Sequence, residues 1–153
     1  MDIHTIILAG GKGTRMLSQK AKVLQALGGT TMLNHVMTAA NKISNKISVV
    51  VGFDKEGVEE EIKKIGINAN TFLQKEQIGT ADAVKTTLKD IDKNEKILIL
   101  YGDVPLIKEE TLKKLCNQES DLSILTTNLE NPTGYGRALK DKENNVLGII
   151  EEK

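Results

Sequence analysis

The residues best suited to chemistry gather in a glycine-rich stretch near the N-terminus, which runs from Leu8 to Arg15 and is followed by Lys22. Glycines let the backbone approach a ligand closely, and the amides of such a loop can point at anionic oxygens. Arg15 and Lys22 add mobile positive charge close by. The stretch therefore predicts a loop that binds the phosphates of a nucleotide, and a tight turn with solvated cations is the alternative.

Two familiar phosphate-binding signatures are missing from this stretch. The Walker A pattern GxxxxGK[ST] does not occur. The dinucleotide-binding fingerprint is incomplete, because Arg15 and Met16 follow Gly11-x-Gly13 where a third glycine would allow close packing of the next helix. An arginine at this point indicates a charge placed for phosphate. The loop by itself leaves both interpretations open.

A second candidate is Asp103, which follows an apolar run ending in Tyr101 and Gly102 and precedes Val104-Pro105. A carboxylate at the end of a buried strand is well placed to hold Mg²⁺, which takes few protein carboxylates and completes its shell with phosphate and water. The alternative is an aspartate that caps the turn before Pro105. The position of Asp103 favours the metal.

Two further groups of polar and glycine residues lie later in the chain. Gln74, Gly79 and Thr80 stand where a helix is expected to begin, and a glutamine amide can bind a base edge as both donor and acceptor. Taken alone, this group favours a simpler interpretation, a capped helix start. The glycine-rich loop at 133–137, which contains Gly136, fits either a close backbone approach to a ligand or a hairpin turn. Glu151 ends the last strand and either bonds a sugar hydroxyl or is simply exposed.

The elements that must position these residues follow from hydrophobic periodicity. Strands alternate with helices to about residue 127, which predicts an α/β domain with a mainly parallel sheet and an antiparallel addition near the end. The carboxyl ends of parallel strands share one edge, so we expect the glycine loop, Gln74 to Thr80, and Asp103 to converge there. The expected strands are 5–8, 47–51, 70–73, 97–100, 122–127, 137–140 and 146–150, and the expected helices are 31–43, 55–64, 80–91 and 109–116.

Length and composition narrow the classes of function. The 153 residues fit one domain without a linker, and 21 basic against 21 acidic residues give no electrostatic case for nucleic acid or an anionic membrane. The single cysteine, Cys116, excludes an internal disulfide and a cysteine-rich metal site, and is expected in the core. No signal peptide or membrane span is recognised, so a cytoplasmic location is expected. The strand-like ending at 146–153 predicts that the natural domain continues.

In order and spacing, five segments of the chain resemble the sugar-1-phosphate nucleotidyltransferases. Within them, the chain is most similar to the uridyltransferase domains of bacterial bifunctional N-acetylglucosamine-1-phosphate uridyltransferase / glucosamine-1-phosphate acetyltransferases. The resemblance covers nearly the whole chain. The segments that carry it are 8–16, 22–24, 74–80, 101–106 and 133–137.

The resemblance implies a fold, a reaction and a set of residue roles. The fold is three-layer and Rossmann-like over residues 1–153, the nucleotide-diphospho-sugar transferase fold. UTP and N-acetylglucosamine 1-phosphate would give UDP-N-acetylglucosamine and pyrophosphate, with Mg²⁺ held by Asp103. Arg15 and Lys22 would neutralise the phosphates, and Gly136 and Glu151 would face the sugar. The implied nucleotide-binding residues are Leu8, Ala9, Gly10, Gly11, Lys22, Gln74, Gly79, Thr80, Tyr101, Gly102 and Asp103.

The chain departs from this family in three places. Ala21 replaces the usual proline before Lys22, and Asp82 stands where the uridyltransferases usually carry histidine. The family's second metal ligand, a later sugar-contacting asparagine and the β-helix acetyltransferase domain would all lie beyond Lys153. A related nucleotidyltransferase for another nucleotide or hexose 1-phosphate therefore stays open, as does a non-catalytic nucleotide-binding fragment. The oligomeric state is not implied.

Overall fold

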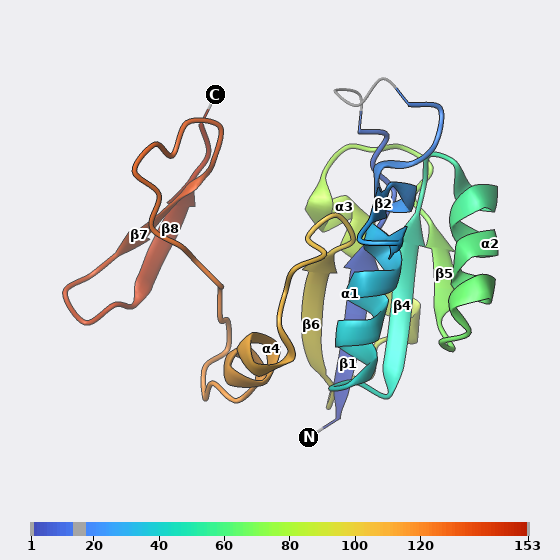
Figure 1. Ribbon diagram of the computed structural model, residues 1–153. Coiled ribbons are helices and arrows are strands. Elements are labelled where there is room, and N and C mark those ends of the chain that lie inside the picture. The colour runs from blue at the N-terminus through green and yellow to red at the C-terminus, as the bar shows by residue number, and fades with distance from the viewer. Residues whose placement is uncertain (1, 14–17, 153) are drawn as a thin grey trace. The chain divides into compact units, whose positions relative to one another are not determined.

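The computed structural model describes residues 2–13 and 18–152 and divides the chain into two compact units, 1–118 and 119–153 (Figure 1). The division falls near residue 118, although the sequence shows no linker there. Each unit is described by itself below.

The first unit is built on a four-stranded parallel sheet with the strand order β5-β4-β1-β6. Its strands are β1 (Ile3–Leu8), β4 (Lys46–Val51), β5 (Asn70–Leu73) and β6 (Lys96–Tyr101). Ile47 to Val51 are all buried, as expected for a central parallel strand covered on both faces. Leu8 is in register with Val50 and with Tyr101, so three strands reach the same edge together.

Helices cover both faces of this sheet, which confirms the predicted three-layer α/β fold (Figure 1). They are α1 (Met32–Asn41), α2 (Lys55–Ile65), α3 (Thr80–Lys85) and α4 (Glu109–Cys116). The neighbouring residues Ile6 and Ile7 of β1 point to opposite faces and belong to separate core clusters. Ile7 packs in the cluster that contains residues of α1, α2 and α4, whereas Ile6 packs with Ala83 of α3.

The helix ends follow local chemistry. The Thr31 hydroxyl accepts a hydrogen bond from the Asn34 amide at 3.1 Å and caps α1. Gly66 ends α2 in the left-handed conformation, with φ at 74°. Cys116 is buried at the end of α4, and burial raises the pKa of its thiol, which confirms it as a core residue.

Two sequence predictions differ from the structure. The helix expected at 80–91 ends at Lys85 and is followed by a 3₁₀ turn, η3 (Leu88–Asp90), because the hydroxyls of Thr86 and Thr87 donate to the carbonyls of Ala83 and Val84. The strand expected at 122–127 is wrong, because this segment has no regular secondary structure and pairs with no strand of the described chain.

The segment after the glycine loop contains small elements that the sequence did not predict. A 3₁₀ turn, η2 (Lys22–Leu24), precedes a short antiparallel pair, β2 (Ala26–Leu27) and β3 (Thr30–Thr31). Gly28 and Gly29 form the connection, both with positive φ. Lys22 is the first residue of the 3₁₀ turn, which therefore fixes its backbone position.

The second unit contains a two-stranded antiparallel sheet, β7 (Arg137–Lys140) and β8 (Val146–Ile150). It confirms the predicted antiparallel addition. The connecting turn is held by Asp141, whose carboxylate accepts from the amides of Glu143 and Asn145 at 2.9 and 2.8 Å. Across the described residues of both units, none of the helices has the length and apolar character needed to cross a membrane.

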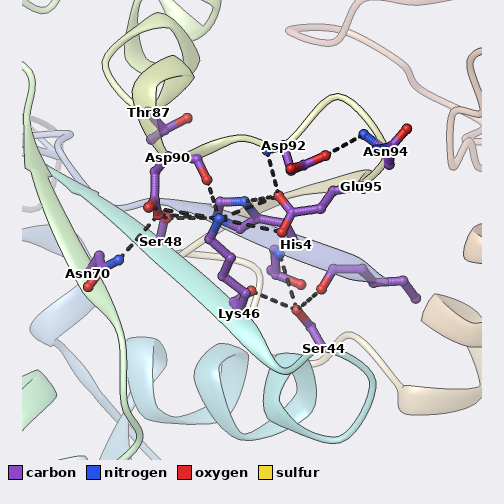
Figure 2. Close-up of polar contacts among 12 residues, drawn as sticks. His4, Ser44, Lys46, Ser48, Asn70, Thr87, Asp90, Asp92, Asn94 and Glu95 are labelled. Carbon is purple, nitrogen blue, oxygen red and sulfur yellow. Dashed lines mark hydrogen bonds and ion pairs between the residues drawn. The ribbon is translucent and has the colours of Figure 1, made fainter. Parts of the chain in front are cut away.

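Polar side chains form a network at the edge from which the strands of the large sheet start (Figure 2). His4 of β1 is fully buried, with Nε2 2.8 Å from the Ser48 hydroxyl and Nδ1 3.1 Å from the Glu95 carboxylate. Lys46 lies 3.4 Å from Glu95 and 3.8 Å from Asp90. His4 is thus a structural residue of the network.

The two carboxylates of this network are stabilised in their charged forms. Partial burial opposes ionisation of Asp90, but hydrogen bonds from Asn70 and Ser48 and the charge of Lys46 lower its pKa below the ordinary value. The pKa of Glu95 is lowered first by the hydrogen bond from the Asp92 amide, and further by its contacts with the network. The network therefore contributes more to stability when both groups are ionised.

Candidate nucleotide-binding site

A cleft of about 620 Å³ opens at the carboxyl edge of the large sheet. The structure thus brings together the residues that the topology predicted to converge there, and which follow β1, β5 and β6 in the sequence. The residues that line the cleft are Leu8, Gly10, Gly11, Lys12, Gly13, Lys22, Val23, Val50, Gln74, Gln77, Gly79, Thr80, Ala83, Tyr101 and Asp103.

Ala9 and Gly102, two residues of the predicted set, do not line the cleft but lie buried beside it. The Ala9 amide donates to the Val50 carbonyl at 2.8 Å, and the Gly102 amide donates to the Leu8 carbonyl at 2.9 Å. A Cβ at Gly102 would lie only 2.9 Å from the Val23 side chain. These two residues therefore continue the sheet under the cleft, where a side chain at Gly102 has no room.

The predicted sugar-binding residues, Gly136 and Glu151, lie in the second unit. They are neighbours there, since a Cβ at Gly136 would lie 3.2 Å from the Glu151 carboxylate. Their role stays a prediction. Arg15, the other predicted catalytic residue, lies outside the described residues.

The start of the glycine loop is held by its backbone. The Gly10 carbonyl accepts from the Phe53 amide at 3.1 Å and from the Gln77 side-chain amide at 2.7 Å. A Cβ at Gly52 would lie 2.8 Å from this carbonyl oxygen, so the two chain segments approach as closely as only glycine permits. Gln77, which also lines the cleft, thus holds the start of the loop through the Gly10 carbonyl.

Gly13 is fixed by two independent requirements. Its φ is +64°, the left-handed region that favours glycine, and a Cβ would lie 2.7 Å from the Cβ of Lys22. The loop thus packs directly on the stem of the lysine. Next to it, the Lys12 ammonium lies 5.3 Å from the centre of the Phe53 ring, within range of a cation–π contact.

Lys22 and Asp103, predicted to bind phosphate and metal, meet in the cleft. The Lys22 Nζ lies 2.7 Å from Asp103 Oδ2, and the two side chains are 40% and 32% exposed. A pair this accessible to water contributes about 0–1 kcal/mol to stability. A charged ligand can therefore separate the two groups at little cost and contact each of them.

Asp54, which follows β4 at the carboxyl edge, has a positioning role that the sequence did not predict. Its carboxylate accepts from the Ala21 amide at 3.1 Å and thereby fixes the segment that carries Lys22. It begins α2 in the left-handed conformation, with φ at 54°. The available signal was Gly57, where a Cβ would lie 2.5 Å from the Asp54 carboxylate. In this chain, the missing side chain at Gly57 leaves the space that the Asp54 carboxylate occupies.

Gln74 lines the cleft next to Gly10 of the glycine loop and is only 7% exposed. Its side-chain Nε2 donates to the Gly79 carbonyl and to Asp82 Oδ2, each at 3.0 Å. The cleft therefore combines a glycine loop, one cation–carboxylate pair and a buried amide. This arrangement suits a ligand that has both phosphates and a heterocyclic base.

Solved structures place the chain in a class. It shares its fold with HddC from Yersinia pseudotuberculosis, at a TM-score of 0.76 and 21% identity, over 99% of this chain and 70% of that one. It also matches a nucleotidyl transferase from Methanothermobacter thermautotroptrophicus, at a TM-score of 0.64 and 21% identity, over 75% and 56% of the two chains. The fold is therefore that of the nucleotide-diphospho-sugar transferases, which confirms the predicted fold class.

Sequence comparison then gives the family. The chain belongs to the MobA-like NTP transferase domain family, whose model matches residues 5–148. It is 46% identical over 154 residues to the bifunctional protein GlmU of Ruthia magnifica, and 44% identical over 156 residues to that of Francisella tularensis subsp. novicida. These matches cover 99–100% of this chain, which spans about a third of the length of those curated relatives.

Proposed function

We propose that this chain is a uridyltransferase domain, which makes UDP-N-acetylglucosamine and pyrophosphate from UTP and N-acetylglucosamine 1-phosphate. The observation that carries the proposal is the cleft in which the glycine loop, the Lys22–Asp103 pair and Gln74 meet. The identity of 44–46% to GlmU over nearly the whole chain supports the choice of substrates. We propose that residues 1–153 belong to one nucleotidyltransferase domain and form an incomplete part of it.

In the proposed complex, the glycine amides and Lys22 bind the triphosphate, while Gln74 and Thr80 lie near the uracil. An oxygen of the sugar phosphate attacks the α-phosphorus. The new phosphorus–oxygen bond forms as the bond between the α-phosphorus and the oxygen that bridges it to the β-phosphate breaks. Pyrophosphate, which keeps that oxygen, leaves. Catalysis then depends on positioning and on neutralised charge, which is the task we assign to Lys22 and, from its place in the sequence, to Arg15.

Asp103 fits a Mg²⁺ ion brought with the triphosphate. Its carboxylate lines the cleft, about a third exposed, and Oδ2 is shared with a lysine from which a ligand can separate it. Mg²⁺ is commonly bound by one or two carboxylates together with substrate phosphates, so a single aspartate suits it. The ion would supply charge neutralisation at the phosphates. Asp103 would hold it, and Lys22 would be released to contact the phosphates directly.

The residues proposed to contact the sugar belong to the second unit and are not among those that line the cleft. Gly136 and Glu151 are proposed to contact the N-acetylglucosamine group, with the Glu151 carboxylate accepting from a sugar hydroxyl. Their proximity to each other supports a shared role, because a Cβ at Gly136 would lie 3.2 Å from that carboxylate. A glycine there leaves the carboxylate open on one side.

The test measures pyrophosphate release by the chain with each pairing of four nucleoside triphosphates and several hexose 1-phosphates. We expect release with UTP and N-acetylglucosamine 1-phosphate in the presence of Mg²⁺. Release with a different pair alone would replace the substrates but keep the nucleotidyltransferase class. UTP binding without any release would show a non-catalytic nucleotide-binding domain and contradict the proposal.

A further inference from the structure

The orientation of the Gln74 side chain is determined by its neighbours. Nε2 has two hydrogens, and both are used: one is donated to the Gly79 carbonyl and one to the Asp82 carboxylate, each at 3.0 Å. Both partners are pure acceptors. A turned amide would set Oε1 against a carbonyl and a carboxylate, so that three acceptors would face one another without a hydrogen between them.

Asp82 contributes more to this orientation than Gly79 does. A hydrogen bond to an ionised acceptor is roughly twice as strong as one between neutral groups. Asp82 lies in the first turn of α3, half-buried, so its carboxylate is held next to Gln74 by the helix itself. The Gln74 amide also donates from its backbone to the Val51 carbonyl at 2.8 Å, which fixes the residue against the sheet.

The atom left for a ligand is Oε1 of Gln74. It lies 3.5 Å from the position that a Cβ on Gly10 would take, so it faces the glycine loop, and both residues line the cleft. This oxygen can only accept. A ligand group placed next to it must therefore bring a donor, or it leaves a largely buried acceptor without a partner.

We propose that Asp82 is a specificity-determining residue that acts through Gln74: it holds Oε1 toward the base so that the cleft selects a base with a ring N–H, uracil, over cytosine. The inference rests on the proposed function, because it assumes a nucleotide base next to Gln74. Uracil carries a hydrogen on N3, whereas N3 of cytosine is an acceptor and its donor is the exocyclic 4-amino group, so Oε1 selects uracil where it meets the ring N3 position. The two rings have the same size, so the donor pattern is what separates them.

A structural role for Asp82 predicts a different result. An acidic residue in the first turn of a helix favours the helix whatever the ligand, so its loss would weaken UTP and CTP binding alike. The ratio of the two affinities isolates the positioning role. Asp82→Asn keeps an acceptor oxygen within reach of Gln74 Nε2, and Asp82→Leu is a near-isostere without one. Lys85→Ala, an exposed substitution on the same helix, is the control.

The experiment measures the Kd of the chain for UTP and CTP, each with Mg²⁺, by calorimetry. We expect the wild type to prefer UTP by about ten- to a hundredfold, from the cost of an unpaired buried acceptor. Asp82→Leu should reduce this preference by about fivefold or more, because the charge-assisted bond that orients the amide is lost. Asp82→Asn should keep most of it, and Lys85→Ala all of it.

A ligand-free measurement complements the affinities. The side-chain amide protons of Gln74, observed by ¹⁵N-resolved NMR, should exchange slowly in the wild type and faster in Asp82→Leu. A wild type that bound both nucleotides equally, or an Asp82→Leu variant with the full preference for UTP, would overturn the inference while nucleotide binding stood. A wild type that bound neither would overturn the proposed function and the inference with it.

Discussion

Replacement of Lys22 by alanine separates two roles of this lysine, its ion pair with Asp103 and its proposed contact with the phosphates. Its ammonium pairs with Asp103 at 2.7 Å, and in the proposed complex it contacts the phosphates. With 40% and 32% of the two side chains exposed, the pair contributes at most about 1 kcal/mol to stability. A hydrogen bond to a charged phosphate contributes about 1.5–3 kcal/mol. The loss in triphosphate binding should therefore exceed the loss in stability.

In numbers, Lys22→Ala should weaken UTP binding by about ten- to a hundredfold, which corresponds to about 1.5–3 kcal/mol. Uridine has no phosphate, so its affinity should stay unchanged. The free energy of unfolding in urea should fall by less than about 1 kcal/mol. Calorimetry with UTP, UMP and uridine at two salt concentrations measures the first two effects, and the charge-dependent part of the loss should shrink as salt rises.

Lys20→Ala is the matched control, because Lys20 is exposed, stands two residues away and does not line the cleft. It should leave all three affinities unchanged. Equal losses for UTP and uridine would refute the reasoning, since they would place Lys22 near the nucleoside or show a general collapse of the site. An unaltered UTP affinity would refute it as directly.

Three further predictions concern Asp103, Gly13 and the Asp90 network. Asp103→Ala should remove the Mg²⁺ dependence of UTP binding and leave the thermal midpoint nearly unchanged, and a persisting dependence in titrations with and without Mg²⁺ would take Asp103 out of the metal site. Gly13→Ala should weaken UTP binding, because the left-handed backbone costs an alanine about 1–2 kcal/mol and its Cβ would lie 2.7 Å from Lys22 Cβ. Gly148→Ala, in β8 and with no atom within 4 Å of the added Cβ, is the control. The pKa values of Asp90 and Glu95 are lowered in the folded chain, so both groups stabilise the fold fully above their ordinary pKa values of 3.8 and 4.5, and this stabilisation is lost progressively as the pH falls below them. The free energy of unfolding in urea, measured between pH 7 and 3, should therefore fall less steeply with acid in Asp90→Asn than in the wild type. An identical slope in the two proteins would contradict the assignment.

Most elements of the first unit could be predicted because their patterns are local. Ile47 and the valines at 49–51 are β-branched and favour a buried strand, and α4 spans the predicted 109–116. The helix at 80–91 was too long because periodicity does not register the hydroxyls of Thr86 and Thr87, which bond to the backbone. The segment 122–127 has strand-like composition, but a strand also needs a partner, which composition does not provide.

The site could be predicted as a location but not as a set of contacts. Ligands bind at the carboxyl edge of a parallel sheet, and this rule alone predicts that the glycine loop, Gln74 and Asp103 converge, as they do in the cleft. The contacts of Lys22 with Asp103 and of Ala21 with Asp54 join residues 81 and 33 positions apart. Their pairing depends on rotamers and on the course of η2, which no spacing encodes.

The Lys22–Asp103 pair and the Gln74–Asp82 pair use a carboxylate at the cleft in opposite ways. Both place a carboxylate next to a group that is proposed to touch the nucleotide. The first pair is exposed and weak, so a ligand with phosphates can break it and use both charges. The second involves a glutamine that is 7% exposed, so the carboxylate stays in place and fixes the direction of the amide. In the proposed complex, the site adapts where it accepts the charged phosphates and stays rigid where it distinguishes bases. The two aspartates therefore need different tests: the affinity for UTP with and without Mg²⁺ for Asp103, and the ratio of the UTP and CTP affinities for Asp82.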